Sequence, residues 1–227
     1  MDLNNINPVK KFTRALLFVV DKSRSMENVI GAINYAFNRS ISIVRTIQER
    51  YPDLLFKINV LEFSEKANWR NDSPENVDQY KWVDLVADGV GVEFADVCKK
   101  LNEKLSSDVF MKNSNDSPIV LLVDSPLGYN YNEELEKLTG VPRFRQTIKK
   151  TIVSGWELRD TDLDALGRFT GKRVNPTPRE LKELSKQILD AVTEAALFGR
   201  NLDDDFIMQR LNQEKEECDR KISNKSF

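Results

Sequence analysis

The stretch Arg14-Ala-Leu-Leu-Phe-Val-Val-Asp-Lys-Ser-Arg-Ser-Met26 sets the interpretation of the whole sequence. Residues 15–20 are all apolar, which predicts a strand buried on both faces, because a half-exposed strand would alternate apolar and polar residues. A carboxylate and two hydroxyls follow at alternate positions: Asp21, Ser23 and Ser25. Ligands of an open α/β sheet bind beyond the carboxyl ends of the strands, and oxygen donors suit a hard cation such as Mg²⁺. The sequence therefore predicts a cation site after this strand.

A second apolar run repeats the pattern. Pro118-Ile-Val-Leu-Leu-Val-Asp124-Ser125 predicts another buried strand that ends in an acidic residue. Two parallel strands of this kind would bring Asp21 and Asp124 together at one edge of the sheet, which is costly unless a cation or hydrogen-bond donors compensate. The alternative is that Asp21 and the two serines only cap the helix that follows them, as such residues often do.

The rest of the chain alternates helical and strand patterns. Apolar residues at three- and four-residue steps predict helices over residues 26–50, from Phe94 to Leu105, in 157–170 and in 181–196, while 56–63 and 151–156 have strand patterns. This order predicts an α/β fold, doubly wound, with a mostly parallel sheet and helices on both faces. Residues 80–86 are expected to be a short strand or extended segment, 106–117 a polar connector, and Trp69 and Trp82 are expected to cover the core.

Length and composition favour one domain with short additions. The 227 residues, 40% hydrophobic and 31% charged, are enough for one sizeable core. We expect residues 1–11 to be a polar lead-in, 12–197 the α/β domain, and 198–227 a charged C-terminal tail or helix, either exposed or disordered. No basic segment precedes an apolar core at the N-terminus and no apolar run is long enough for a membrane span, so a cytoplasmic location is expected.

Charge and residue usage exclude several function classes. The formal net charge of −2 gives no broad basic field for nucleic acid. The chain has no histidine and only two distant cysteines, Cys98 and Cys218, so zinc sites, disulfide frameworks and histidine-dependent catalytic triads have no support. No P-loop motif is present.

Several motifs together resemble one family. Asp21-Lys-Ser-Arg-Ser-Met26 after a buried strand is similar to the DxSxS signature of von Willebrand factor A (vWA) domains, and so are the strand end Glu62-Phe-Ser64 and the Leu-Leu-Val-Asp strand that ends at Asp124. The resemblance covers roughly residues 12–197. It implies a Rossmann-like fold with a metal-ion-dependent adhesion site (MIDAS), where a partner's carboxylate completes the coordination of a divalent ion. It assigns Asp21, Ser23, Ser25 and Asp124 as ligands of Mg²⁺, or of Mn²⁺.

The sequence departs from the family pattern in two places. Aligning Gly89 and Gly91 with the family's glycines puts Val92 where a threonine usually supplies a metal ligand, and valine has no oxygen to give. Asp88 or Glu93 could substitute only from a neighbouring position, so we expect neither to do so. Ser125 replaces the glycine that usually follows the second aspartate. The resemblance therefore implies a degenerate adhesion site, either weakened or vestigial.

Three functions follow from these patterns. The chain is most similar to single-domain bacterial vWA proteins of tellurium-resistance and stress or defence gene neighbourhoods, which implies a non-enzymatic protein-binding module whose partners include a nearby kinase or phosphatase. A structural scaffold with a dead metal site is the first alternative. The second is a phosphotransferase or phosphohydrolase with Asp21 as nucleophile, but that chemistry needs a second aspartate where Ser23 stands.

Overall fold

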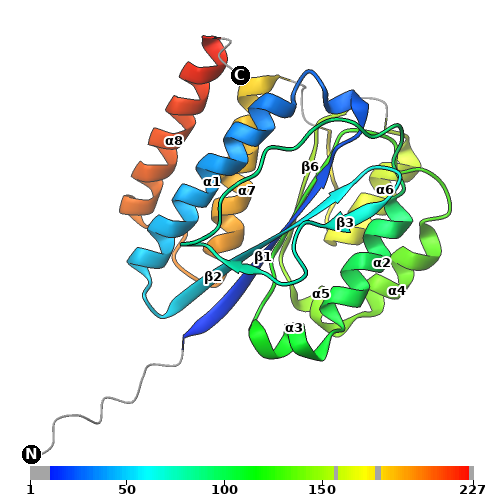
Figure 1. Cartoon of the computed structure of the whole chain (residues 1–227), viewed down its shortest axis with the longest axis horizontal. Coiled ribbons are helices and arrows are strands. Elements are labelled where there is room, and N and C mark those ends of the chain that lie inside the picture. Colours follow the sequence, from blue (N-terminus) through cyan, green and yellow to red (C-terminus); the bar gives the residue numbers. More distant parts are fainter. Residues whose placement is uncertain (1–10, 156–157, 177–179, 225–227) are drawn as a thin grey trace, which may run out of the picture.

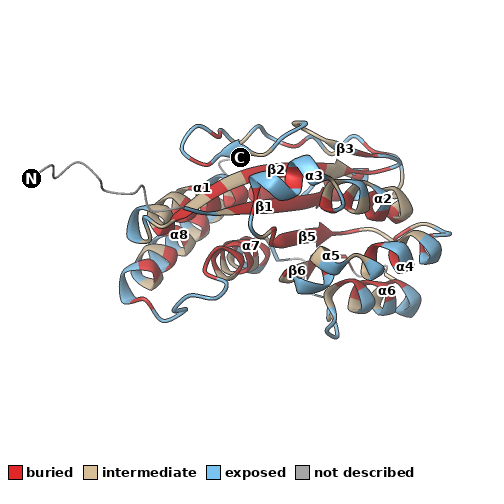
Figure 2. Ribbon diagram, turned by 90° about the horizontal axis from the view of Figure 1, so that it is seen from below, coloured by how far each residue is buried: buried red, intermediate tan, exposed pale blue. Residues whose placement is uncertain are grey.

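The computed structural model describes residues 11–155, 158–176 and 180–224, in which a sheet lies between two layers of helices (Figures 1 and 2). Of the expected lead-in, residues 1–11, only Lys11 is described. Trp156 and Glu157, at the end of the expected strand 151–156 and the start of the expected helix 157–170, also lie outside the described residues. The elements, in chain order, are β1 (Phe12–Asp21), a 3-10 turn η1 (Arg24–Met26), α1 (Ile30–Arg50), β2 (Leu54–Phe63), β3 (Ala67–Trp69), β4 (Glu75–Asn76), α2 (Phe94–Leu105), α3 (Asp108–Asn113), β5 (Ile119–Val123), α4 (Asn132–Gly140), α5 (Pro142–Gln146), β6 (Lys149–Val153), α6 (Asp160–Thr170), α7 (Leu181–Ala196) and α8 (Asp205–Ser223).

The sheet has β1 at its centre. Its strand order is β3-β2-β1-β5-β6, and β1 pairs in parallel with both β2 and β5, as β5 does with β6. The short strands β3 and β4 pair antiparallel with β2. The predicted fold class, a mostly parallel sheet with helices on both faces, is confirmed.

Successive residues of β1 point into two separate cores. Leu16, Phe18 and Val20 pack with α1, α7 and α8 on one face of the sheet. Leu17 and Val19 pack with α2, α4, α5 and α6 on the other face. Residues 15–20 are all 0% exposed, which explains why this run contains no polar residue.

The C-terminal segment is part of the first core. Among the two forms expected for residues 198–227, the structure has a helix, α8, which lies along α1 and α7 with Ile207, Leu211 and Cys218 buried (Figure 1). Its Glu214 is 0% exposed and pairs with Arg39 of α1. The helix is therefore packed on the domain, and the expectation of an exposed or disordered tail is wrong for residues 205–223. No helix of the described residues combines the length and apolarity that crossing a membrane requires.

Local structure differs from the sequence patterns in three places. The helix expected from residue 26 begins at Ile30, after the turn η1. Of the two forms expected for residues 80–86, the short strand is not present, and the side chain of Asn34 bonds both the N–H and the carbonyl of Leu85, at 2.7 and 3.0 Å. The expected polar connector contains α3, whose Phe110 is buried. Trp82 covers the core as predicted, stacked on Phe37 with ring centroids 4.9 Å apart.

One buried side chain in the sheet predicts a stabilising substitution. Asn59 of β2 is 0% exposed, and neither of its side-chain polar atoms has a hydrogen-bond partner within the described residues. An unpaired buried polar group costs about 1–3 kcal/mol, and valine suits a strand, so we expect Asn59→Val to raise the free energy of unfolding by about 1 kcal/mol. Urea denaturation measures this change. The exposed strand residue Asn68 provides the control, since Asn68→Val should change stability by less than about 0.5 kcal/mol. A loss of stability in Asn59→Val would mean that the amide has a partner, such as a bound water.

Candidate functional site

The two aspartates predicted to converge do so at the carboxyl ends of β1 and β5. These strands are neighbours in the sheet, with Val20 paired to Leu122, so the loops that follow them start side by side. The chain then leaves β1 toward α1 on one face and leaves β5 toward α4 on the other. This is a topological switch point, where the loops separate and open a crevice for a ligand.

Asp21 joins the two loops through main-chain hydrogen bonds. Its Oδ1 accepts the N–H of Ser23 at 2.8 Å, in the loop after β1. Its Oδ2 accepts the N–H groups of Asp124 and Ser125, both at 3.1 Å, in the loop after β5. Because the side chain is 0% exposed and both oxygens accept N–H groups, Asp21 positions the two loops from the buried side of the site.

The charge of Asp21 is costly in this position. Burial raises the pKa of its carboxyl from the ordinary 3.8 to about 6, although the hydrogen bonds from Ser23 and Asp124 act in the opposite direction. The nearby negative charge of Asp124 raises that pKa further. A cation beside the two carboxylates would favour their ionised forms and remove part of this cost.

Three serine hydroxyls form a triangle above these carboxylates. The Oγ atoms of Ser23 and Ser25 are 2.9 Å apart, and the Oγ of Ser125 lies 2.7 Å from the first and 2.6 Å from the second. Two of these serines come from the loop after β1 and the third from the loop after β5. The triangle therefore forms only when both loops are in place.

Asp124 is held at the other side of the site. It is 3% exposed, and its Oδ1 accepts a hydrogen bond from the hydroxyl of Ser154, at 2.6 Å, just beyond β6. Gly155 follows, and its backbone lies against the carbonyl of Asp124, where an added Cβ would be 1.9 Å from the oxygen. The end of β6 thus fixes both the side chain and the main chain of Asp124.

A third loop, residues 87–93 before α2, reaches the site through its main chain. Gly89 forms a bridge with Ser23, and the N–H of Arg24 donates to the carbonyl of Gly89 at 2.7 Å. Val92 lines the hollow at the site, as the alignment of glycines predicted, but it brings no oxygen there from its side chain. The two carboxylates considered as substitutes do not line the hollow, and Asp88 instead pairs with Lys22 at 3.0 Å.

The capping alternative for the serines is not supported. Ser23 stands at the N-cap position of η1, yet its side chain makes no capping hydrogen bond. The N-cap residue of α1 is Val29, again without a side-chain cap. The hydroxyls of Ser23 and Ser25 bond one another and Ser125 instead, so they face a shared site.

The donor set fits a hard cation. Adjacent oxygen ligands in an ideal Mg²⁺ octahedron are about 2.9 Å apart, because each lies about 2.1 Å from the ion, and the three hydroxyl separations are close to that value. Within the described ranges there is no group of three or more His, Cys, Asp and Glu side chains that could hold a metal, so hydroxyl oxygens would have to supply most of the protein ligands. Such oxygen donors suit Mg²⁺ better than zinc.

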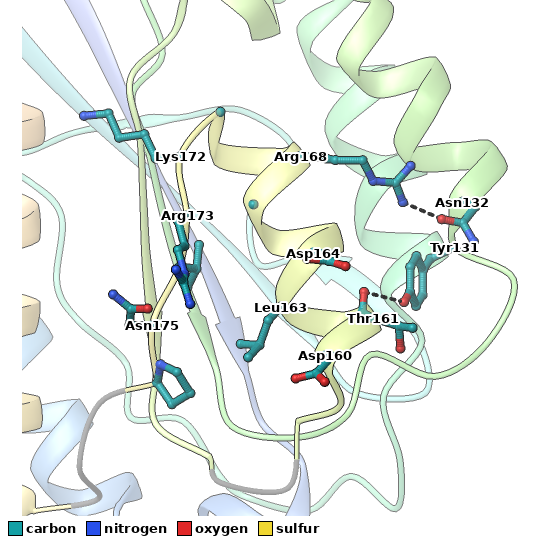
Figure 3. A pocket seen from close by; sticks show the side chains of 14 residues that line it. Tyr131, Asn132, Asp160, Thr161, Leu163, Asp164, Arg168, Lys172, Arg173 and Asn175 are labelled. Atoms are coloured by element: carbon teal, nitrogen blue, oxygen red, sulfur yellow. Dashed lines mark hydrogen bonds between the residues drawn. The ribbon is translucent and has the colours of Figure 1, made fainter.

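A larger hollow lies away from these residues, beside α6 (Figure 3). Its volume is about 1120 Å³, and none of the serines and aspartates of the candidate site line it. Residues around it bond one another: the Tyr131 hydroxyl donates to the main-chain carbonyl of Thr161 at 3.2 Å, and the Arg168 side chain donates to the Asn132 side chain. Both acidic and basic residues line it, so its charge favours no single class of ligand.

Sequence reasoning missed two residues of the site. Ser125 was considered only as a replacement for glycine, whereas its hydroxyl completes the triangle. Ser154, the partner of Asp124, is one serine among many and follows an unremarkable strand. The only available signal was that Ser125 follows Asp124 directly, at the same strand end.

Solved structures share this fold. No protein-family model matches the sequence, and no curated protein matches it significantly. A von Willebrand factor type A structure from Catenulispora acidiphila is 11% identical with a TM-score of 0.61, over 82% of this chain and 43% of its own. Proximal thread matrix protein 1 from the mussel byssus, solved with a zinc-occupied MIDAS motif, is 18% identical with a TM-score of 0.53, over 82% and 46%.

The PilB minor pilin from Streptococcus sanguinis is 16% identical with a TM-score of 0.55, over 82% of this chain and 62% of its own. At these identities the similarity shows the fold, which is therefore of the vWA type. This chain spans less than two thirds of each of these three structures.

Proposed function

We propose that this chain is a protein-binding domain whose binding site is built around a divalent cation, Mg²⁺ or Mn²⁺. The observation that carries the proposal is the convergence of Asp21, Asp124 and three serine hydroxyls from two loops at one switch point. The vWA-type fold supports it, since one neighbour has a zinc-occupied MIDAS motif and others are a minor pilin and a pilus adhesin.

The geometry suggests a division of roles among the residues. Ser23, Ser25 and Ser125 present hydroxyl oxygens to the hollow, and Ser125 compensates for the oxygen that Val92 lacks. Asp124 supplies negative charge beside them, while the buried Asp21 positions both loops and contributes its charge from below. When bound, the ion would act as a Lewis acid that attracts a partner's carboxylate.

We propose that the domain performs no bond-making reaction. An aspartyl nucleophile must reach its substrate, but Asp21 is 0% exposed and both of its oxygens accept main-chain N–H groups. This argues against the phosphotransferase alternative.

The scaffold with a dead metal site is the second candidate, and one observation favours it. The three hydroxyls lie within hydrogen-bond distance of one another, so each can donate once and accept once without any ion. The hydroxyls would then have hydrogen-bond partners without any cation. Only a binding measurement separates this candidate from the first.

Removing one hydroxyl of the triangle tests the proposal. We expect Ser25→Ala to weaken Mg²⁺ and Mn²⁺ binding at least about tenfold in calorimetric titration, because the site offers few protein oxygens and a water would have to replace the one that is lost. Ser25 is exposed, so the fold and its thermal midpoint should change little.

The matched control is Ser73→Ala, which removes an exposed serine from another part of the surface and should leave cation affinity unchanged. If the wild-type protein gives no saturable cation signal at millimolar concentrations, the scaffold is the better account. Turnover of a phosphomonoester such as p-nitrophenyl phosphate, lost in Asp21→Ala, would instead support an enzyme.

Two finer parts of the proposal rest on the motif resemblance alone. These are a role in a bacterial stress or defence system and a partner that is a kinase or phosphatase encoded nearby. A cytoplasmic location is proposed as well. The small net charge supports the view that the partner is a protein and not nucleic acid. Cation-dependent co-purification of the wild-type chain, but not of Ser25→Ala, with such an enzyme would test them.

A further inference from the structure

The loop after β5 presents an aromatic side chain in a fixed position. Tyr129 is 74% exposed, and its neighbours Gly128 and Asn130 both have left-handed backbones, with φ values of 79° and 63°. A Cβ on Gly128 would lie 2.4 Å from the carbonyl oxygen of Val92, so the loop after β5 also packs closely on residues 87–93. Glycine and asparagine are the residues that adopt this backbone most readily.

Arg159, at the start of α6, holds this loop. Its Nη2 donates to the carbonyl of Gly128 at 2.8 Å, and its guanidinium lies 5.2 Å from the centre of the Tyr129 ring. Arg159 is itself fixed by Asp162, which is 0% exposed and accepts hydrogen bonds from its Nε at 2.9 Å and from its Nη2 at 2.8 Å. An exposed tyrosine that is already ordered loses little entropy on binding, which is typical of residues that dominate an interface.

A second apolar side chain lies on the rim of the same hollow. Val90 is 84% exposed, and its N–H donates to Glu65 at 2.6 Å. The preceding residue, Gly89, is packed on Ser64, where a Cβ would lie 2.2 Å from the serine Cβ. The backbone that carries Val90 is therefore fixed as well. Val90 and Tyr129 both line the hollow of about 460 Å³ that contains the serine triangle.

The charged side chains that line this hollow are basic, which favours an acidic ligand when a cation offsets Asp21 and Asp124. Among the described residues that line it, Arg24 and Arg159 are cationic and none is an aspartate or glutamate. Arg159 is neutralised by Asp162, whereas Arg24 is exposed and no ion pair of its side chain is found in the described part of the chain. Arg24 thus adds an uncompensated positive charge at the edge of the site.

We infer that Tyr129, Val90 and Arg24 form a specificity surface that binds a partner segment in which an acidic side chain is flanked directly by bulky apolar residues. The acidic group would enter the hollow between the serines and Arg24, and the flanking side chains would pack on Tyr129 and Val90. This inference rests on the proposed function, because the acidic group is placed at the same site. It adds the chemistry that distinguishes one acidic segment from another.

The test uses three blocked pentapeptides and the full-length chain. The first is acetyl-Gly-Leu-Asp-Leu-Gly-amide, the second has glycine in place of both leucines, and the third has asparagine in place of aspartate. Each is titrated into ¹⁵N-labelled protein with Mg²⁺ present, and Kd is obtained from chemical-shift changes. We expect the first peptide to bind at least about fivefold more tightly than either of the others, because burying apolar side chains and pairing the charge both contribute.

Two variants assign that preference to the surface. Tyr129→Ala and Val90→Ser should each reduce the difference between the leucine and glycine peptides to less than about twofold, with the affinity for Mg²⁺ measured in parallel. Tyr129→Phe keeps the ring and should keep most of the preference. Val109→Ser removes a valine that is 68% exposed on α3 and serves as the matched control.

The outcomes separate this inference from the proposed function. Equal affinity for the leucine and glycine peptides, a preference that survives in both variants, tight binding of the asparagine peptide, or no binding of any peptide would each overturn the inference. In each of these cases the proposed function still stands if the wild-type protein binds Mg²⁺ and Ser25→Ala binds it at least about tenfold more weakly. Conversely, a leucine-peptide preference that persists without Mg²⁺ supports the surface while contradicting the role of the ion.

Discussion

Replacing Asp21 by alanine is expected to abolish saturable Mg²⁺ binding and to lower the free energy of unfolding by about 2–4 kcal/mol near pH 5. Three main-chain N–H groups, those of Ser23, Asp124 and Ser125, lose their acceptor. Each buried unpaired donor costs about 1–3 kcal/mol, and water entering the vacated space offsets part of the total. Without the side chain that joins the loops, the serine triangle loses its fixed geometry.

The stability cost of this substitution should depend on pH. The pKa of Asp21 is about 6 in the folded protein against an ordinary value of 3.8, so the folded state binds more protons than the unfolded state between these values. The contribution of Asp21 to stability is then complete below about pH 4 and is lost as the pH rises through about 6, by roughly 3 kcal/mol. The deficit of Asp21→Ala relative to wild type should shrink accordingly between pH 4 and about pH 7.

Mg²⁺ should counteract this loss in the wild-type protein only. A bound cation favours the ionised carboxylate, so the stabilisation by Mg²⁺ should be larger at about pH 7.5 than at about pH 5. Guanidinium denaturation of wild type and Asp21→Ala at both pH values, with and without Mg²⁺, measures the stabilisation by Mg²⁺ and its dependence on pH. Asp203→Ala, at an exposed aspartate before α8, is the control. A deficit of Asp21→Ala that grows with pH, or Mg²⁺ affinity equal to wild type, would contradict the role assigned to Asp21.

Gly155→Ala is expected to destabilise the protein by about 3 kcal/mol and to weaken cation binding at least about tenfold. The added Cβ would lie 1.9 Å from the carbonyl oxygen of Asp124 and 2.8 Å from its carbonyl carbon. These are main-chain atoms at the end of a fully buried strand, so no flexible side chain can move aside. Overpacking of this kind typically costs 1–3 kcal/mol, and the displaced loop also carries Ser125.

The matched control is Gly140→Ala in α4. No heavy atom lies within 4 Å of the Cβ position at Gly140, and the residue ends a helix, so alanine should be neutral or slightly stabilising. Thermal unfolding and Mn²⁺ titration of both variants give the comparison. If Gly155→Ala is as stable as Gly140→Ala and binds Mn²⁺ like wild type, the close packing of β6 on the site has no energetic importance.

The two strands that carry the site could be predicted because a buried strand has an unbroken run of apolar residues. A strand covered on both faces must be apolar at every position, so the runs that end at Asp21 and Asp124 were recognisable without coordinates. The expectation that their acidic tips meet required the strands to be parallel and adjacent, and they are both. The position of Val92 beside the site followed from the glycines that precede it.

The C-terminal helix shows where composition was misleading. Its high charge suggested an exposed tail, yet Glu214 is buried and paired with Arg39, and three apolar or thiol side chains pack on α1 and α7. A charged residue looks solvent-exposed in a sequence unless its partner is known, and here that partner lies on another helix far along the chain.

The sequence by itself determined the α/β class, the two buried strands, and Asp21, Ser23, Ser25 and Asp124 as candidate ligands. Only the tertiary structure showed that Asp21 binds the main chain of both loops, that Ser125 and Ser154 belong to the site, and that Tyr129 is held on its rim. The physical reason is the distance along the chain over which each feature is determined. Burial and periodicity leave a local pattern in the chain, whereas a hydrogen bond between residues on different loops depends on strand order and register.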